Sequence, residues 1–184
     1  RDVLRKHRGE LGAEAVQQVL ESDDYLREQV GVLRRRAEVI SDLIIRRVKV
    51  NRTRTPQQAL DATGRKQYTD RKVVDSMPRG EGKEVEVVLF KPDLSKCGGW
   101  ISDADLEKEF ELRDLKPADP ISVAAMNEAD PAFADENPHS THWKNTDGQW
   151  CFAAFSRWRV GRSVVVYRYG YDWCGYWWFA GLRK

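Results

Sequence analysis

The feature that most constrains the fold is a series of strand-like runs at the C-terminal end of the chain. Apolar alternation between glycine-bearing turns predicts three strands, within QWCFAAFSRW (149–158), RSVVVYRY (162–169) and YWWFAGLRK (176–184). A fourth alternating run, KEVEVVLF (83–90), lies much earlier in the sequence. Because this run and the last one are both long and apolar, we expect them to pair and to bring the two ends of one domain together.

Helices are predicted ahead of these strands and between them. The first of four has Thr55 as N-cap, Pro56 in its first turn and Gly64 as its stop signal. The four segments are 55–64, 69–77, 102–115 and 120–131. The order of helices, one strand, two helices and three strands predicts an α+β domain with helices on one side of a small antiparallel sheet.

Residues 1–54 are predicted to form a separate helical segment. Its apolar residues alternate between spacings of four and three, which is typical of a short coiled coil or of one face of an amphipathic helix. These residues are Leu26, Val30, Leu33, Ala37, Ile40 and Ile44. Residues 1–50 could therefore mediate homo-oligomerisation, pack on their own domain or belong to a larger fused chain. The predicted organisation is 1–54 helical, 55–79 short helices or linker, and 80–184 the folded domain.

Charge and cysteine content limit the environment of the protein. The net charge is +2, but both ends of the chain are basic and the middle is acidic. The basic ends could face nucleic acid or an acidic partner, or could be balanced by the acidic middle within one fold. We expect no membrane span, and three cysteines are too few for a disulfide framework. This favours an intracellular protein, whereas a signal ahead of Arg1 would allow display on a cell surface or virion.

The sequence contains no established catalytic motif. G-x-S-x-G, P-loop and G-x-G-x-x-G patterns are absent, and helix caps and turns account for Asp103, Asp105, Asp114 and Asp119. His139 and His142 form an H-x-x-H pair in a proline-rich stretch, which we interpret as loop histidines and not as zinc ligands. We therefore expect no metal and no cofactor, and an enzyme is the less favoured class.

Residues 156–176 use few residue types and alternate like a strand. The period of two places Ser163, Val165, Tyr167, Tyr169 and Tyr171 on one face and Val164, Val166 and Arg168 on the other. Tyrosine with small polar neighbours and arginine is typical of binding surfaces, although the tyrosines could instead form a sheet-stabilising ladder. We predict that tyrosines face outward over a set of buried anchors, with Arg168 or Arg183 tying the loops. The predicted anchors are Trp158, Trp173, Trp177, Trp178 and Phe179.

Ten positions in this region share a property of the genetic code. Each residue can be written by a codon that ends in C and whose first two bases are free, the set reached by randomising the adenines of an AAC codon. The positions are Ser156, Arg159, Val160, Ser163, Val165, Tyr167, Tyr169, Tyr171, Cys174 and Tyr176. With fixed residues between them and the ending WWFAGLRK, residues 156–176 resemble the hypervariable region of a target protein of a diversity-generating retroelement.

The resemblance implies a C-type lectin-like fold over roughly residues 80–184, with small twisted antiparallel sheets and two helices. It also implies a receptor-like protein that is diversified by adenine mutagenesis from a retroelement template and binds ligands, expected to be proteins, through the ten positions. The lectin calcium motifs are missing, so calcium-dependent sugar recognition is not implied. Two alternatives stay open: a nucleic-acid-binding module that uses basic and aromatic residues, and an enzyme of the formylglycine-generating type. The enzyme would need a thiol pair, such as Cys151 and Cys174, in a cleft.

Overall fold

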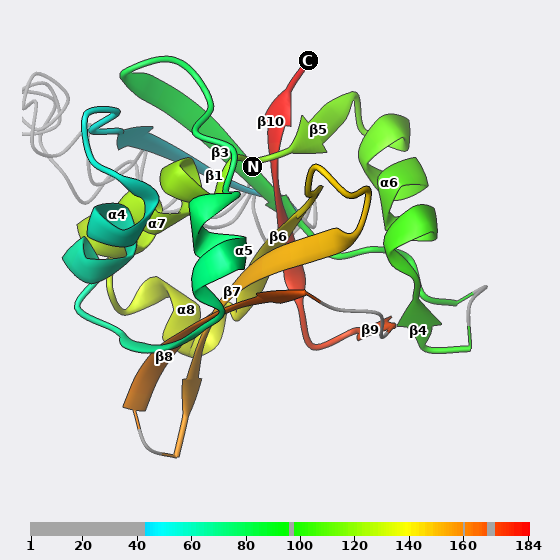
Figure 1. The fold of residues 1–184 in the computed structure, drawn as a ribbon. Coiled ribbons are helices and arrows are strands. Elements are labelled where there is room, and N and C mark those ends of the chain that lie inside the picture. The colour runs from blue at the N-terminus through cyan, green and yellow to red at the C-terminus, as the bar shows by residue number, and fades with distance from the viewer. Residues whose placement is uncertain (1–42, 96–97, 160, 169–171) are drawn as a thin grey trace, which may run out of the picture. The chain divides into compact units, whose positions relative to one another are not determined.

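A computed structural model of the chain describes residues 43–95, 98–159, 161–168 and 172–184 (Figure 1). The chain divides into two units after Asp42, and the described residues all belong to the second, Leu43–Lys184. The predicted helical stripe from Leu26 to Ile40 lies outside the described residues. Residues 43–79, which the sequence assigned to a helical segment and a linker, are part of the same compact unit as the C-terminal strands.

The described residues form a mixed α+β fold, which confirms the predicted class. Its strands are β1 (Leu43–Lys49), β2 (Lys66–Thr69), β3 (Glu84–Phe90), β4 (Trp100–Ile101), β5 (Leu115–Pro117), β6 (His139–Lys144), β7 (Trp150–Trp158), β8 (Gly161–Arg168), β9 (Trp173–Cys174) and β10 (Trp178–Arg183). Its helices are α4 (Pro56–Ala62), α5 (Arg71–Asp75), α6 (Asp103–Leu112), α7 (Pro120–Ala129) and α8 (Phe133–Glu136).

One eight-stranded sheet organises the domain. Its order is β1-β3-β10-β6-β7-β8-β2 with β5 alongside β10, and β4 and β9 form a separate two-stranded sheet. The predicted pairing of the early and last strands is confirmed, because β3 and β10 are antiparallel with Phe90 opposite Phe179. The expectation of a purely antiparallel sheet is wrong, since β10 pairs with β6 and β2 pairs with β8 in parallel.

Local signals locate the helices correctly. Thr55 caps α4 in a reciprocal capping box: its hydroxyl accepts from the Gln58 amide at 3.2 Å and its own amide donates to the Gln58 side chain at 2.9 Å. Asp70, Ser102 and Asp119 cap α5, α6 and α7 through their side chains. These caps satisfy backbone groups within a few residues, which is why the sequence shows them.

The prediction that the helical segment continues to residue 54 is wrong, because residues 43–49 form strand β1. Ile44 lies opposite Leu89 and Val48 opposite Val85 in an antiparallel ladder with β3. A spacing of four residues places side chains on one face of a helix and equally on one face of a strand. The spacing between Ile44 and Val48 could not distinguish the two, and the hydrogen bonds offered by β3 decide it.

The sheet separates two apolar layers. Helices α4, α5, α7 and α8 pack on one face, against residues that include Leu89, Phe155 and Val166. Helix α6 and the β4–β9 sheet pack on the opposite face, against Phe90 and Phe179 among others. The helices therefore cover both faces and not one side, as the ribbon in Figure 1 also shows.

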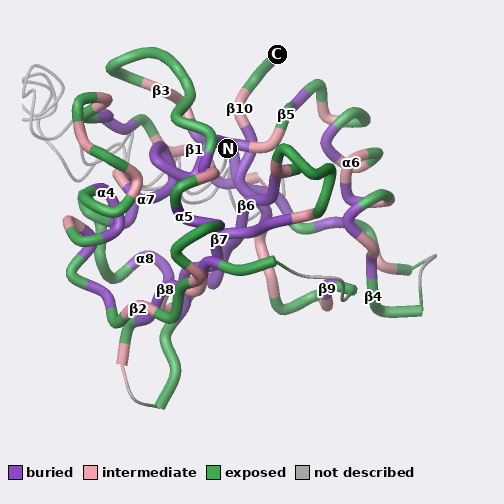
Figure 2. Tube along the Cα trace, in the orientation of Figure 1, coloured by how far each residue is buried: buried purple, intermediate pink, exposed green. Residues whose placement is uncertain are grey.

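The second layer leaves the distal ends of β7 and β8 open. Its buried cluster extends along β7 as far as Ala154, with Val165 of β8 half-buried at its edge. Trp158, beyond this point, and Tyr68, opposite Val165 on β2, are exposed. Figure 2 shows the change from buried to exposed residues toward the hairpin tip. The open end of the sheet can therefore present side chains to a ligand.

Arg52 fastens the segment after β1 to α7 and to the turn before β3. Its guanidinium donates to Asp119 at 2.7 Å and to the Ser122 hydroxyl at 2.9 Å, and also to the Gly82 and Glu81 carbonyls. Gly80 has a φ of +63°, and a Cβ at this position would lie 2.1 Å from Asp119 Oδ2. The Asp119 carboxylate of this ion pair is therefore buried, and the missing side chain of Gly80 leaves space for it.

Replacing Arg52 with glutamine should lower the free energy of unfolding by about 3 kcal/mol, because it leaves the buried Asp119 carboxylate without its cation. Arg47→Gln is the matched control, since the Arg47 side chain is 70% exposed and contacts only Glu86 among the ion pairs of the described residues. The control should change stability by less than about 1 kcal/mol. Urea denaturation followed by circular dichroism measures both, and equal effects would contradict the role given to Arg52.

Candidate functional site

The open end of the sheet carries a surface that we call the hairpin face. In the strand register, Ala154 of β7 lies opposite Val165 of β8, which lies opposite Tyr68 of β2. The next row toward the tip consists of Ser156, Ser163 and Lys66, followed by Trp158. Tyr167 lies in the row on the other side, opposite Phe152. Directly opposed residues share a face, so these side chains form one continuous surface.

The predicted alternation of β8 is confirmed. Val164 and Val166 are fully buried, whereas Tyr167 is 51% exposed and Val165 is half-buried. The hydroxyl of Tyr167 is therefore not part of the core that the valines build. Val160, Tyr169 and Tyr171 lie outside the described residues.

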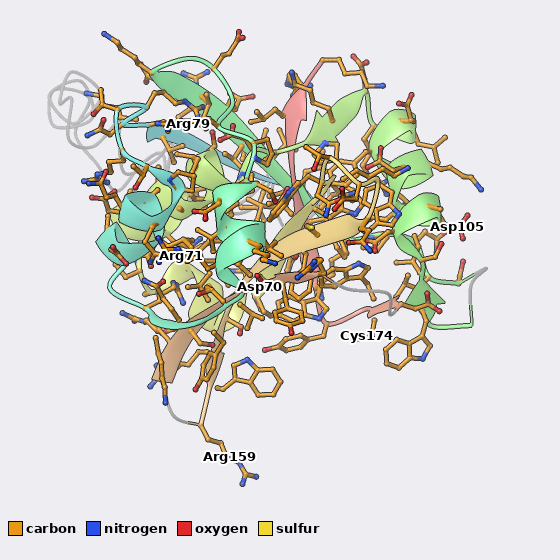
Figure 3. All side chains as sticks on the ribbon, in the orientation of Figure 1. Asp70, Arg71, Arg79, Asp105, Arg159 and Cys174 are labelled. Atoms are coloured by element: carbon orange, nitrogen blue, oxygen red, sulfur yellow. The ribbon has the colours of Figure 1, made fainter. Side chains whose placement is uncertain are left out.

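The other positions of the predicted variable set fall into two groups. Arg159 extends from the hairpin tip (Figure 3), Tyr176 is exposed and Cys174 is half-buried. Ser156 and Ser163 were expected to be displayed but are 1% exposed. Their short side chains lie below the level of their larger neighbours. Both hydroxyls are buried without a hydrogen-bond partner among the described residues.

The five predicted anchors differ in how deeply they are buried. Trp173 and Phe179 are buried, and Trp177 and Trp178 are half-buried. Trp158 is 59% exposed, so its prediction as a buried anchor is wrong. It occupies the last ladder position before the turn, opposite Gly161, where the apolar layer has already ended. Trp158 is thus part of the exposed surface and not of its support.

Two hollows adjoin Trp158 on this face. The tyrosine hollow, of about 310 Å³, is lined by Tyr68, Trp158, Ser163 and Val165. The tryptophan cavity, of about 280 Å³, shares Trp158 and Val165 with it. The aromatic rings of the tryptophan cavity are Trp100, Phe152, Trp158, Trp173 and Trp177, and Asp172, Ala154 and Cys174 complete its lining. A small apolar group can therefore enter on either side of Trp158.

Sequence reasoning missed Tyr68 and Trp100. Tyr68 belongs to a strand of four residues between two short helices, and Trp100 to a strand of two residues. Such short elements show too little periodicity to be recognised. A tyrosine within the alternating stretch KQYT is the sequence signal that could have pointed to Tyr68.

Ion pairs hold the opposite side of the hairpin. Asp135 accepts from Arg162 at 2.9 Å and from Arg157 at 3.1 Å, and these hydrogen bonds lower the pKa of its carboxyl. Arg168 donates to Asp70, the N-cap of α5, at 2.7 Å, so the predicted tie by Arg168 exists. Arg183 instead lies 3.5 Å from Glu86 and joins β10 to β3.

His142 forms a buried polar hub beneath α6. The interpretation of His139 and His142 as loop residues is wrong, because both lie in strand β6 and are buried. His142 Nδ1 is 2.7 Å from Asp103 and Nε2 is 2.7 Å from Glu107. Asp103 also accepts from the Trp173 indole at 2.9 Å. Burial disfavours the charged imidazole, but the hydrogen bonds to Asp103 and Glu107 outweigh it and raise the pKa of His142 above 6.5.

His139 is also buried, but its surroundings favour the neutral imidazole, whereas those of His142 favour the charged form. Its Nδ1 lies 2.7 Å from the Asn137 carbonyl and its Nε2 lies 2.8 Å from the Asn127 amide nitrogen. This arrangement suits a neutral ring that donates at Nδ1 and accepts at Nε2. Burial lowers the pKa of His139 to about 4. Partners occupy all four ring nitrogens of the two histidines. Among the described residues, no three or more His, Cys, Asp or Glu side chains are placed so that they could hold a metal ion, those around His142 included.

The two alternative functions make demands on particular residues: the enzyme of the formylglycine-generating type needs two thiols in one cleft, and the nucleic-acid-binding module needs basic residues that can face phosphates. Cys151 belongs to the apolar layer that α4, α5, α7 and α8 cover, whereas Cys174 lines the tryptophan cavity on the opposite face of the sheet. These two thiols do not share a cleft, and Cys97 lies outside the described residues. Among the basic residues after β1, Arg52 and Arg54 pair with Asp119 and Glu128. Their charge is therefore used within the fold and is less available to phosphates.

No family model, no curated protein and no solved structure matches this chain. Within the described residues, no helix combines the length and apolar character that crossing a bilayer requires. The geometry of the hairpin face is therefore the basis for assigning a function.

The His142 hub should make stability depend on pH with a defined sign. A histidine whose folded pKa is raised contributes fully below its unfolded pKa of 6.5 and loses that contribution as pH rises through the folded value. The stability difference between wild type and His142→Gln should be about 3 kcal/mol below pH 6.5 and should shrink above it. Urea denaturation over a pH series measures it.

His139→Gln is the control, because the pKa of His139 is shifted in the opposite direction. The unfolded state takes up a proton near pH 6.5 and the folded state only near 4, so the wild-type advantage over this variant should decrease as pH falls between these values. Parallel pH profiles for the two variants would contradict the assigned protonation states.

Proposed function

We propose that the chain is a ligand-binding protein that displays diversified side chains on the hairpin face, in the manner of the target proteins of diversity-generating retroelements. The carrying observation is that β8 divides its side chains between two environments. Val164 and Val166 are buried on the face of the sheet that α4, α5, α7 and α8 cover, while Val165 and Tyr167 face the open side. Residues on the open side can change with little effect on the packing below.

The arrangement of elements supports a C-type lectin-like scaffold. β3 and β10 pair and bring the two ends of residues 84–184 together. Two longer helices, α6 and α7, lie between β3 and the strand series β6-β7-β8. This is the order that the resemblance implies for such a fold. β1, β2, α4 and α5 are additions, of which the strands β1 and β2 extend the sheet at its two edges.

The exposure of the varied positions also supports display. Arg159, Tyr167 and Tyr176 are exposed, and Val165 and Cys174 are half-buried. Ser156 and Ser163 form the floor between them, where a small residue leaves room for a ligand. Exposed substitutions away from caps and cores usually change stability little, which a diversified surface requires.

The surface suits a protein ligand. Its exposed rings, Tyr68, Trp158 and Tyr167, offer large rigid contact areas with few rotatable bonds. The two hollows are small, so they fit individual side chains of a partner better than a whole cofactor. Aromatic residues and arginine are also enriched at protein interfaces.

The triple variant Arg159→Ser, Tyr167→Ser and Tyr176→Ser should unfold within about 1 kcal/mol of wild type, because the three side chains are exposed. Trp173→Ala, which removes a buried ring that also hydrogen-bonds Asp103, should lose about 3–5 kcal/mol. Urea denaturation compares the two variants. A triple variant as unstable as Trp173→Ala would show that the displayed residues support the fold, which the proposal excludes.

The proposal also predicts a second copy of the coding segment for residues 156–176 near the gene. Its codons should read AAC where the ten positions stand, and it should lie beside a reverse transcriptase gene. Sequencing the locus tests this directly. A complete locus without such a copy, or a copy whose differences are not confined to adenines, would overturn the retroelement part of the proposal.

A further inference from the structure

The tryptophan cavity has the composition of a site for a positively charged group without hydrogen-bond donors. Five aromatic rings line it, and Asp172 is the only charged residue among the described residues that do so. A cation is attracted to the faces of aromatic rings, most strongly to those of tryptophan. The aromatic rings and the Asp172 carboxylate therefore both favour a positively charged ligand.

Two pairs of these rings lie nearly at right angles. Trp173 meets Phe152 at 89° with centroids 5.3 Å apart, and it meets Trp177 at 84° with centroids 5.8 Å apart. Trp173 and Phe152 are buried, whereas Trp100 and Trp158 are more than half exposed. These rings pack edge to face and present surfaces in different directions, so a compact group beside them can contact more than one ring.

The polar groups of the lining distinguish between cations. An unmodified ammonium carries three N–H donors, and leaving them unpaired in an apolar cavity is unfavourable. Indole nitrogens only donate, so Asp172 is the one strong side-chain acceptor in the described lining. A trimethylated ammonium has no N–H to satisfy and keeps its charge. It matches the cavity better than lysine or arginine.

We propose that the tryptophan cavity is an aromatic cage for a trimethylated lysine of the protein ligand, an inference that rests on the proposed binding function. At about 280 Å³ it lies just below the roughly 300–1,000 Å³ of small-molecule sites, which suits one side chain. The tyrosine hollow adjoins it across Trp158, with the unpartnered Ser163 hydroxyl in its wall. A peptide can place side chains in both hollows, whereas a single choline headgroup occupies one.

The cage is built mainly from residues that diversification leaves unchanged. Of its lining, only Val165 and Cys174 belong to the ten varied positions. All five rings lie at fixed positions or before residue 156. A constant cage would bind one chemical group in every variant of the protein, while the varied side chains around it recognise what surrounds that group.

The test uses three short peptides in a glycine–serine background, which differ in one side chain: trimethyllysine, lysine, and the neutral analogue in which carbon replaces the quaternary nitrogen. Binding to the full chain is followed through the indole N–H resonances of its seven tryptophans. The trimethyllysine peptide should bind at least about fivefold more tightly than the neutral analogue, since a cation–π contact contributes about 1 kcal/mol. It should also bind more tightly than the lysine peptide.

Variants locate the site. Trp100→Ala removes an exposed ring of the cage and should weaken trimethyllysine binding by about 5- to 30-fold. Asp172→Asn should reduce the preference for the charged peptide over its neutral analogue without unfolding the protein. Leu112→Ala is the control, because Leu112 is an exposed apolar side chain of α6 that lines neither hollow. It should leave binding of these peptides within about twofold.

Several results would overturn the cage. Equal binding of the charged and neutral peptides would show a purely apolar pocket, and no binding of any peptide would show no pocket for this group. Binding of phosphatidylcholine vesicles without binding of the trimethyllysine peptide would assign the cavity to a membrane headgroup. Each of these would leave the retroelement template and the stability of the triple surface variant untouched, so failure of the cage is distinguishable from failure of the proposed function.

Discussion

The two-faced packing of β7 and β8 is the constraint on which the rest of the structure depends. Val164, Val166 and Phe155 bury one face against the helices, and Asp135 fixes the end of that face through Arg157 and Arg162. The backbone of the hairpin is therefore held from one side. On the other face, the apolar cluster ends at Ala154 and Val165. A binding surface beyond these residues is therefore compatible with a stable fold.

The other layer supports this surface through polar contacts as well as apolar ones. Asp103 at the start of α6 accepts from both His142 and Trp173, so one carboxylate joins β6, α6 and β9. Trp173 is at once a buried ring of the core and an inner wall of the tryptophan cavity. The hydrogen bond to Asp103 therefore helps to hold the Trp173 ring in the wall of the cavity.

The candidate site was predictable where its signal was local or periodic. The alternation along β8 placed Tyr167 outward and its valine neighbours inward, and the burial confirms this. Trp158 was misjudged because residue type predicts burial only on average, whereas its actual exposure depends on how far α6 and the β4–β9 sheet extend over β7. The histidines were misjudged because a proline before a short strand resembles a loop in sequence, and because the carboxylate partners of His142 lie 39 and 35 residues away.

The sequence by itself determined the helix caps, the C-terminal strands, their facing pattern and the mixed α+β class, since each depends on neighbours within a few residues. Tertiary structure alone decided that residues 43–49 form a strand, that Tyr68 joins the hairpin face and that Trp100 lines the tryptophan cavity. In each case the deciding contact is with a residue distant in the chain: β3 for β1, β8 for β2, and β9 for β4. Such pairings depend on the path of the whole chain, and no local pattern of residues records them.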